Sequence, residues 1–154
     1  MTYSSRNQQI KVALATLILP VLFPTAAHAQ LSPTLQPQEL AAKQYVIEMN
    51  KAQQDYYQNN TGFTSSVSNL ALGIKAGTAN YKYSIDTANK AVFNYAVSDR
   101  ANLKNFVGGV FLIGNKTTTI LCLNVASGKI KPAKPTMDTK GVVACGANTA
   151  KVAQ

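Results

Sequence analysis

The stretch AAKQYVIEMNKAQQDYYQNNTGF, residues 41–63, has the clearest periodicity in this chain of 154 residues and decides the fold. Between Gln38 and Asn59 there is no proline or glycine, and apolar side chains recur at steps of three to five residues. This spacing predicts one long helix. Its apolar face should consist of Leu40, Tyr45, Met49, Ala52 and Tyr56, widened by Val46 and Gln53. Residues 59–62 (Asn-Asn-Thr-Gly) should end the helix, because they tolerate the left-handed C-cap conformation.

An alternating pattern replaces the helical one later in the chain. A loop rich in small residues (64–79) should first place Leu70, Leu72 and Ile74 in the core. Strands are then predicted at 81–85, 92–97, 110–113, 117–125 and 142–145. Short turns at 86–90 and 114–116 favour antiparallel pairing, and Gly108-Gly109 suggests a bulge or a close backbone approach. The fold class is therefore α+β, with one long N-terminal helix packed on an antiparallel β-sheet of four to five strands.

The first 29 residues have the features of a secretory signal peptide. A polar start with two basic residues precedes an apolar run of twelve at 12–23, and Ala27-His28-Ala29 has the small-x-small pattern of a cleavage site. The alternative is an uncleaved membrane anchor, but a spanning helix needs roughly 20 apolar residues. We expect cleavage between Ala29 and Gln30, a linker at 30–37 and a globular domain at 38–154. The product would be periplasmic or secreted, with no stable membrane span.

Export would place the two cysteines, Cys122 and Cys145, in an oxidising compartment, where a structural disulfide is the default. A redox pair would need a close CxxC spacing, and a metal site would need further ligands. The chain has neither. A disulfide closing this loop would stabilise the fold by roughly 3 kcal/mol.

Few residues in the expected mature chain could carry chemistry. The only histidine is His28, in the signal region, so no imidazole is left for a nucleophile pair or a metal site. The carboxylates are scattered, and Glu48 and Asp55 would lie about 10 Å apart along the helix. No phosphate-binding or dinucleotide-binding glycine motif occurs. We predict no catalytic, cofactor-binding or metal-binding residues, no cofactor and no enzymatic activity.

The mature chain is basic, with 13 of the 15 Lys and Arg residues and all 6 acidic ones following residue 29. Its positive charge is concentrated towards the C-terminus. A proline-containing loop at 129–140 holds Lys129, Lys131, Lys134 and Lys140, and is a candidate site for an anionic polymer. A solvated basic surface without a ligand is the alternative.

The order of the segments in residues 39–146 resembles that of type IV pilin-like proteins of the general secretion pathway G/H (pseudopilin) family. The segments that carry the resemblance are AAKQYVIEMNKAQQDYYQNNTGF, LALGIK, NYKYSI, FNYAVS, FVGGVFLI, KPAKPT and VVACG. The resemblance implies the second half of a long helix packed on an antiparallel sheet, with a C-terminal disulfide. Only the globular part is similar. A prepilin has a leader ending in glycine, a Gly-Phe cleavage pair and a glutamate in its apolar helix. Here no glycine precedes Gly62, there is no Gly-Phe cleavage pair, and the apolar run at 12–23 contains no glutamate.

Together these features predict an exported, non-enzymatic pilin-like domain. Its partners would be pilus or secretion-system components, or it would decorate the cell surface. The alternative is a periplasmic or extracellular module that binds DNA or acidic polysaccharide through its lysine-rich C-terminal region.

Overall fold

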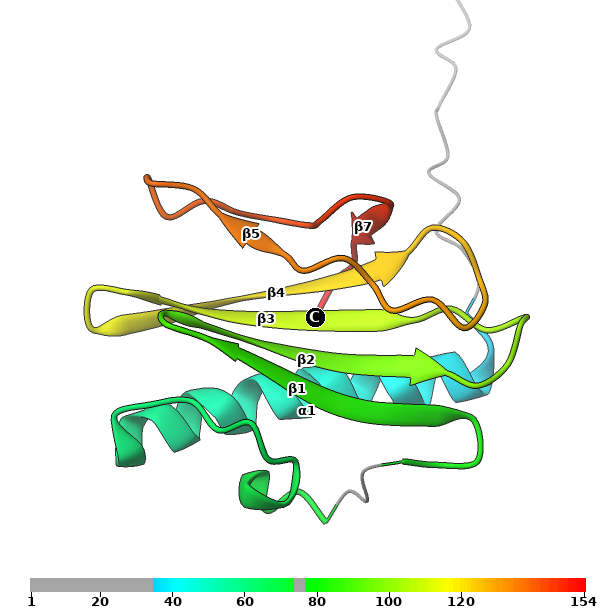
Figure 1. Cartoon of the computed structure of the whole chain (residues 1–154), viewed down its shortest axis with the longest axis horizontal. Helices are drawn as coiled ribbons and strands as arrows, with labels where there is room; N and C mark the ends of the chain where they lie inside the picture. The colour runs from blue at the N-terminus through cyan, green and yellow to red at the C-terminus, as the bar shows by residue number, and fades with distance from the viewer. Residues whose placement is uncertain (1–34, 74–76) are drawn as a thin grey trace, which may run out of the picture. The chain divides into compact units, whose positions relative to one another are not determined.

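The computed structural model describes residues 35–73 and 77–154 (Figure 1). The first element of this part is the helix α1 (Pro37–Asn60). Pro37 occupies the first turn, where its missing N–H is not needed. Thr61 ends the helix in the left-handed conformation (φ 55°), and its N–H donates to the Tyr57 carbonyl at 2.9 Å. The predicted helix is confirmed, although the left-handed residue is Thr61 and not Gly62.

The predicted apolar face of α1 is only partly right. Leu40 is 52% exposed, and the buried stripe is displaced around the helix. Its members are Glu39, Ala42, Val46, Met49, Asn50 and Gln53. Three of these six are polar, and each has hydrogen-bond partners in the sheet or in the loops. The prediction included Gln53, but a search for apolar periodicity does not count Glu39 and Asn50, which explains the displacement.

A five-stranded antiparallel sheet follows the helix in the chain (Figure 1). Its strands are β1 (Tyr81–Ala88), β2 (Ala91–Ser98), β3 (Phe106–Ile113), β4 (Lys116–Asn124) and β7 (Thr149–Lys151), in the order β1-β2-β3-β4-β7. The predicted α+β class is therefore confirmed. The turn predicted at 86–90 is shorter than expected, because β1 continues to Ala88.

Two further short strands, β5 (Thr136–Met137) and β6 (Val143–Ala144), form a separate two-stranded sheet. The strand predicted at 142–145 thus exists, but it pairs with β5 and lies outside the main sheet. The fifth strand of the main sheet is β7, which pairs with β4 and was not predicted. A single turn of 3-10 helix, η1 (Ser68–Leu70), lies in the loop after α1.

The sheet has a hydrophobic core on each face. One lies between α1 and the sheet, where Val46 and Met49 meet Tyr81, Phe106 and Leu121. Leu70 is buried in this core and Leu72 packs against it, as predicted, while Ile74 lies outside the described residues. The second core, on the opposite face, contains Phe93, Tyr95, Val107, Phe111 and Ile120, with Met137 and Val143 packed against it. The segment that carries β5 and β6 therefore covers the face opposite α1.

The predicted signal peptide, the cleavage site at Ala29 and Gln30, and most of the linker at 30–37 lie outside the described residues. No helix within residues 35–73 and 77–154 has the length and apolar character that crossing a membrane requires.

Candidate functional site

The candidate anion-binding loop, residues 129–140, crosses the sheet on the face opposite α1. Two of its lysines bind the same carboxylate of β1. The Lys131 Nζ lies 3.0 Å and the Lys134 Nζ 3.4 Å from Asp86 Oδ2. The residue after each of these lysines, Pro132 and Pro135, is buried, so the chain turns inward there. The loop is thus attached to the edge strand of the sheet by ion pairs.

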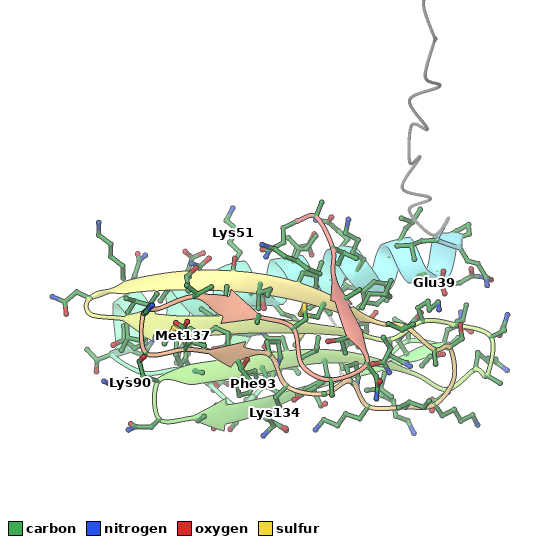
Figure 2. All side chains as sticks on the ribbon, turned by 90° about the horizontal axis from the view of Figure 1, so that it is seen from above. Glu39, Lys51, Lys90, Phe93, Lys134 and Met137 are labelled. Atoms are coloured by element: carbon green, nitrogen blue, oxygen red, sulfur yellow. A yellow bond between two sulfur atoms is a disulfide. The ribbon has the colours of Figure 1, made fainter. Side chains whose placement is uncertain are left out.

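The same two lysines also lie over aromatic rings of β2. Lys131 Nζ is 4.2 Å from the centroid of the Tyr95 ring. Lys134 Nζ is 5.4 Å from the centroid of the Phe93 ring, and Figure 2 labels these two residues. Ammonium groups at such distances are attracted by the ring quadrupole. Both lysines therefore have intramolecular roles, which a free anion would have to compete with.

The electrostatics of Asp86 follow from these contacts. Partial burial raises the pKa of Asp86, but the hydrogen bond from Lys131 and the charges of Lys131 and Lys134 outweigh burial, so that the pKa of Asp86 is lowered. The carboxylate remains ionised at neutral pH and neutralises one of the two ammonium charges.

The other two lysines of the candidate site lie at the ends of the loop. Lys129 and Lys140 are exposed, and within residues 35–73 and 77–154 neither has a carboxylate at ion-pair distance. Lys140 belongs to the turn between β5 and β6, whereas Lys129 follows β4. The structure brings Lys131 and Lys134 together on Asp86, and separates them from the other two.

The predicted disulfide is present and connects the two layers on this face. Cys122 of β4 and Cys145, which follows β6, are bonded, with Cα atoms 5.7 Å apart. Cys122 is fully buried in the second core. The bond therefore attaches the end of the covering segment to the centre of the sheet.

Three buried tyrosines have raised pKa values. Burial is the largest cause for each, and it raises the pKa of Tyr83 to about 12 and those of Tyr81 and Tyr95 further. The Tyr81 hydroxyl donates to the Lys104 carbonyl at 2.7 Å. The Tyr95 hydroxyl has no hydrogen-bond partner within the described residues. These phenols remain neutral at physiological pH, and they serve the packing of the two cores.

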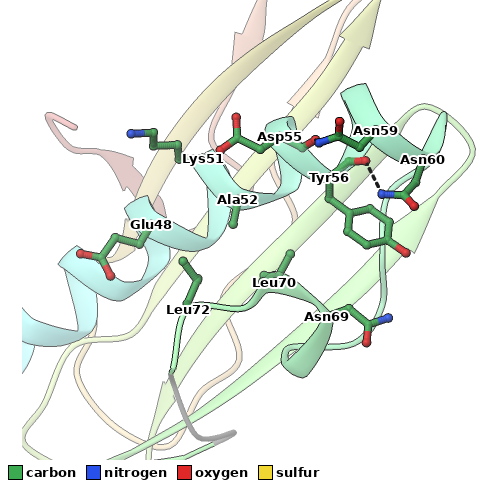
Figure 3. A pocket seen from close by; sticks show the side chains of 10 residues that line it. All are labelled: Glu48, Lys51, Ala52, Asp55, Tyr56, Asn59, Asn60, Asn69, Leu70 and Leu72. Atoms are coloured by element: carbon green, nitrogen blue, oxygen red, sulfur yellow. Dashed lines mark hydrogen bonds between the residues drawn. The ribbon is translucent and has the colours of Figure 1, made fainter.

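Glu48 and Asp55, the closest pair of carboxylates in the helix sequence, line an open groove of about 320 Å³ between α1 and Asn69–Leu72 (Figure 3). Lys51 lies between them along the helix, and Lys51 and Asp55 point away from Leu70 and Leu72. The amide nitrogens of Asn59 and Asn60 donate to helix carbonyls. In the described part of the chain, no three His, Cys, Asp or Glu side chains are close enough to hold a metal ion.

Sequence reasoning missed a polar seam between α1 and the rest of the domain. Asn50 donates to the Ile120 carbonyl and accepts from Asn94, while Gln53 exchanges two hydrogen bonds with the backbone of Thr64. Glu39 accepts from the N–H groups of Gln36 and Lys104, each at 2.7 Å. The signal in the sequence was their position relative to the buried apolar residues, because Glu39 stands three residues before Ala42 and Gln53 stands four after Met49.

A family model for type IV pilin-like G and H proteins matches residues 39–146. The chain belongs to this family. The match to the type IV pilin-like G and H family begins in the first turn of α1 and ends directly after Cys145, so it includes the helix, β1 to β6 and the disulfide. The resemblance proposed from the sequence is thereby confirmed. The comparisons with curated proteins and with solved structures find no match for this pilin-like chain.

Proposed function

We propose that this protein is an exported, non-enzymatic pilin-like domain that associates with pilus or secretion-system components, or with the cell surface. The observation that carries the proposal is the family match over residues 39–146, which coincides with a helix packed on an antiparallel sheet. Membership of a pilin-like family favours assembly with pilus or secretion-system components, and a protein partner is therefore the expected ligand.

Two independent features support export. The apolar run at 12–23 and the small-x-small pattern before Gln30 are typical of a cleaved secretory signal. The disulfide between Cys122 and Cys145 requires an oxidising compartment to form and persist. We place the mature N-terminus at Gln30, followed by a short linker to the domain.

The roles of the ionisable groups support a non-enzymatic function. Glu39 is buried and holds backbone N–H groups, Asp86 binds two lysines, and both cysteines are consumed by the disulfide. These groups have structural partners, so that they are not positioned to act as acid, base or nucleophile on a substrate.

The test is cross-linking in the native cells. The protein carries a tag after Gln154 and is purified from sheared surface and membrane fractions after mild cross-linking. Mass spectrometry is expected to identify subunits of a pilus or secretion system among the proteins recovered with it. The matched control carries residues 1–37 on an unrelated disulfide-bonded domain, which keeps the export route and removes the pilin-like surface. If the two proteins recover the same neighbours, the pilin-like domain makes no specific contact and the proposal is wrong.

The alternative, binding of DNA or acidic polysaccharide by the loop 129–140, has less support because Asp86 already binds Lys131 and Lys134. It predicts retention on heparin that weakens steeply with salt and falls when all four loop lysines are changed to glutamine. If that variant elutes at the same salt concentration as the parent, the loop is not the site.

A further inference from the structure

Three turns meet at one end of the sheet and form an exposed surface there. They connect β1 to β2, β3 to β4, and β5 to β6, and all three lie at the left in Figure 1. Two large apolar side chains remain exposed at this end. Ile113 is 41% and Val142 is 61% exposed. Exposed aliphatic side chains that gather with charged residues around them are typical of interaction sites.

Contacts among the three turns place the residues of this surface next to one another. Ile113 is paired across the β3–β4 ladder with Lys116. A Cβ at Gly141 would lie 3.1 Å from Ile113 Cδ1, so the β5–β6 turn touches the same side chain. The Leu112 N–H donates to the Lys90 carbonyl at 2.8 Å, which brings in the β1–β2 turn. We call the group Lys90, Ile113, Lys116, Lys140 and Val142 the end surface.

The end surface is positively charged. Its three lysines are exposed; Lys90 and Lys140 lie in turns, and Lys116 is the first residue of β4. The carboxylate within these turns is Asp138, whose Oδ1 accepts the N–H groups of Lys140 and Val142 at 2.9 and 2.8 Å. It therefore caps its own turn. The nearest acid of β1, Asp86, is held by Lys131 and Lys134. The three turns thus combine three lysines and one capping carboxylate with two exposed aliphatic side chains.

We propose that the end surface binds an anionic lipid bilayer. Lysines near an anionic membrane are attracted by its surface potential, and each contributes about fivefold to partitioning. Aliphatic side chains at the same level can enter the boundary between headgroups and acyl chains. A nucleic acid or a polysaccharide would use the lysines, but it would gain little from Ile113 and Val142. This inference goes beyond the proposed pilin-like function and does not depend on which protein partner that function uses.

The test is cosedimentation with vesicles. The protein used is residues 30–154, because the apolar run at 12–23 would bind any bilayer. This part contains the whole described fold, since α1, both sheets, both cores and the disulfide lie within 35–154. Circular dichroism and intact mass establish that each variant is folded and disulfide-bonded. The protein is expected to bind vesicles of equal parts phosphatidylglycerol and phosphatidylcholine at low salt. It should not bind vesicles of phosphatidylcholine alone, and binding should weaken as salt rises.

Three variants locate the site. Changing Lys90, Lys116 and Lys140 to glutamine should lower partitioning roughly 100-fold. Changing Ile113 and Val142 to serine should lower it about tenfold. The matched control changes Lys43, Lys51 and Lys151 to glutamine, which removes the same charge from α1 and β7, and it should stay within about twofold of the parent.

Three outcomes would overturn the proposal. In the first, the protein does not bind anionic vesicles even at low salt. In the second, the control and the end-surface lysine variants weaken binding equally, which would show a response to net charge alone. In the third, the serine variant binds vesicles as the parent does, while heparin or duplex DNA competes for the lysines. The end surface would then be a polyanion site and not a lipid site.

Discussion

At the residue scale, Gly108 of β3 lies directly against the side chain of Asn50 of α1. A Cβ at this position would lie 2.2 Å from Asn50 Oδ1, so no other residue fits there without moving the helix or the amide. Asn50 is 1% exposed, and its amide joins Ile120 and Asn94 across the interface. Gly108 therefore provides the space for a buried hydrogen-bond network.

Gly108→Ala is expected to lower the free energy of unfolding by about 2 to 4 kcal/mol, since it overpacks the interface and displaces the Asn50 amide from its partners. Urea unfolding at neutral pH measures the change. The matched control is Gly62→Ala, because a Cβ there would have no contact closer than 3.9 Å. It should stay within about 0.5 kcal/mol of the parent. Equal effects of the two substitutions would contradict this account of Gly108.

Asp86 gives a pH-dependent prediction. The pKa of Asp86 is lowered in the folded state, so the ionised carboxylate stabilises the fold. This stabilisation is fully present above the unfolded pKa of about 3.9, and it is lost as the pH falls through the lower pKa of the folded state. Because its side chain is 32% exposed, the contribution is modest. Asp86→Asn should reduce stability by about 0.5 to 1 kcal/mol at pH 7. Urea unfolding should show that the difference in free energy of unfolding between Asp86→Asn and the parent vanishes at acidic pH, where Asp86 is protonated. A difference that persists there would mean that packing, and not charge, makes Asp86 important.

At the element scale, Glu39 joins the start of α1 to the loop between β2 and β3. One oxygen accepts the Gln36 N–H and the other accepts the Lys104 N–H. Glu39→Gln keeps the size of the side chain, but it turns one acceptor into a donor that faces an N–H. We expect a loss of about 1 to 3 kcal/mol in the free energy of unfolding, together with faster hydrogen exchange at Lys104.

The matched control for Glu39 is Glu48→Gln in the same helix. Glu48 is half-buried, and its hydrogen bond is an exposed one from Gln44 at 3.2 Å. Its substitution should change stability by no more than about 0.5 kcal/mol. If it destabilises as strongly as Glu39→Gln, the effect comes from helix charge and not from the connection to Lys104.

The elements themselves were largely predictable, because helix and strand periodicity are local properties of the sequence. The failures have physical causes. β7 (Thr149–Lys151) is three residues long and has no alternating apolar pattern. The strand at Val143–Ala144 has the right residues, but periodicity does not say which strand it pairs with. The close approach at Gly108 was predicted, while its partner Asn50 was not, because a polar residue gives no hydrophobic signal.

At the scale of the whole molecule, contacts between distant segments decide what the candidate site can do. Lys131 and Asp86 are separated by 45 residues in the sequence, and nothing local to either one indicates that they meet. The sequence therefore predicts four lysines as one patch, whereas the fold holds Lys131 and Lys134 on Asp86 and places Lys140 in the turn between β5 and β6. A run of charges in the sequence does not show which of its members find a counterion on a distant strand.

The disulfide is a second contact of this scale, and it should act mainly on the unfolded chain. Cys122 and Cys145 close a loop with a sequence separation of 23 residues. Replacing Cys122 by Ala and Cys145 by Ser should lower the free energy of unfolding by about 3 kcal/mol and raise the denaturant dependence, because the unlinked chain expands further. Urea unfolding of the parent in reductant, after mass spectrometry verifies complete reduction, should give the same midpoint as the double variant. A double variant as stable as the oxidised parent would mean that the packing of Met137 and Val143 alone holds the covering segment on the sheet.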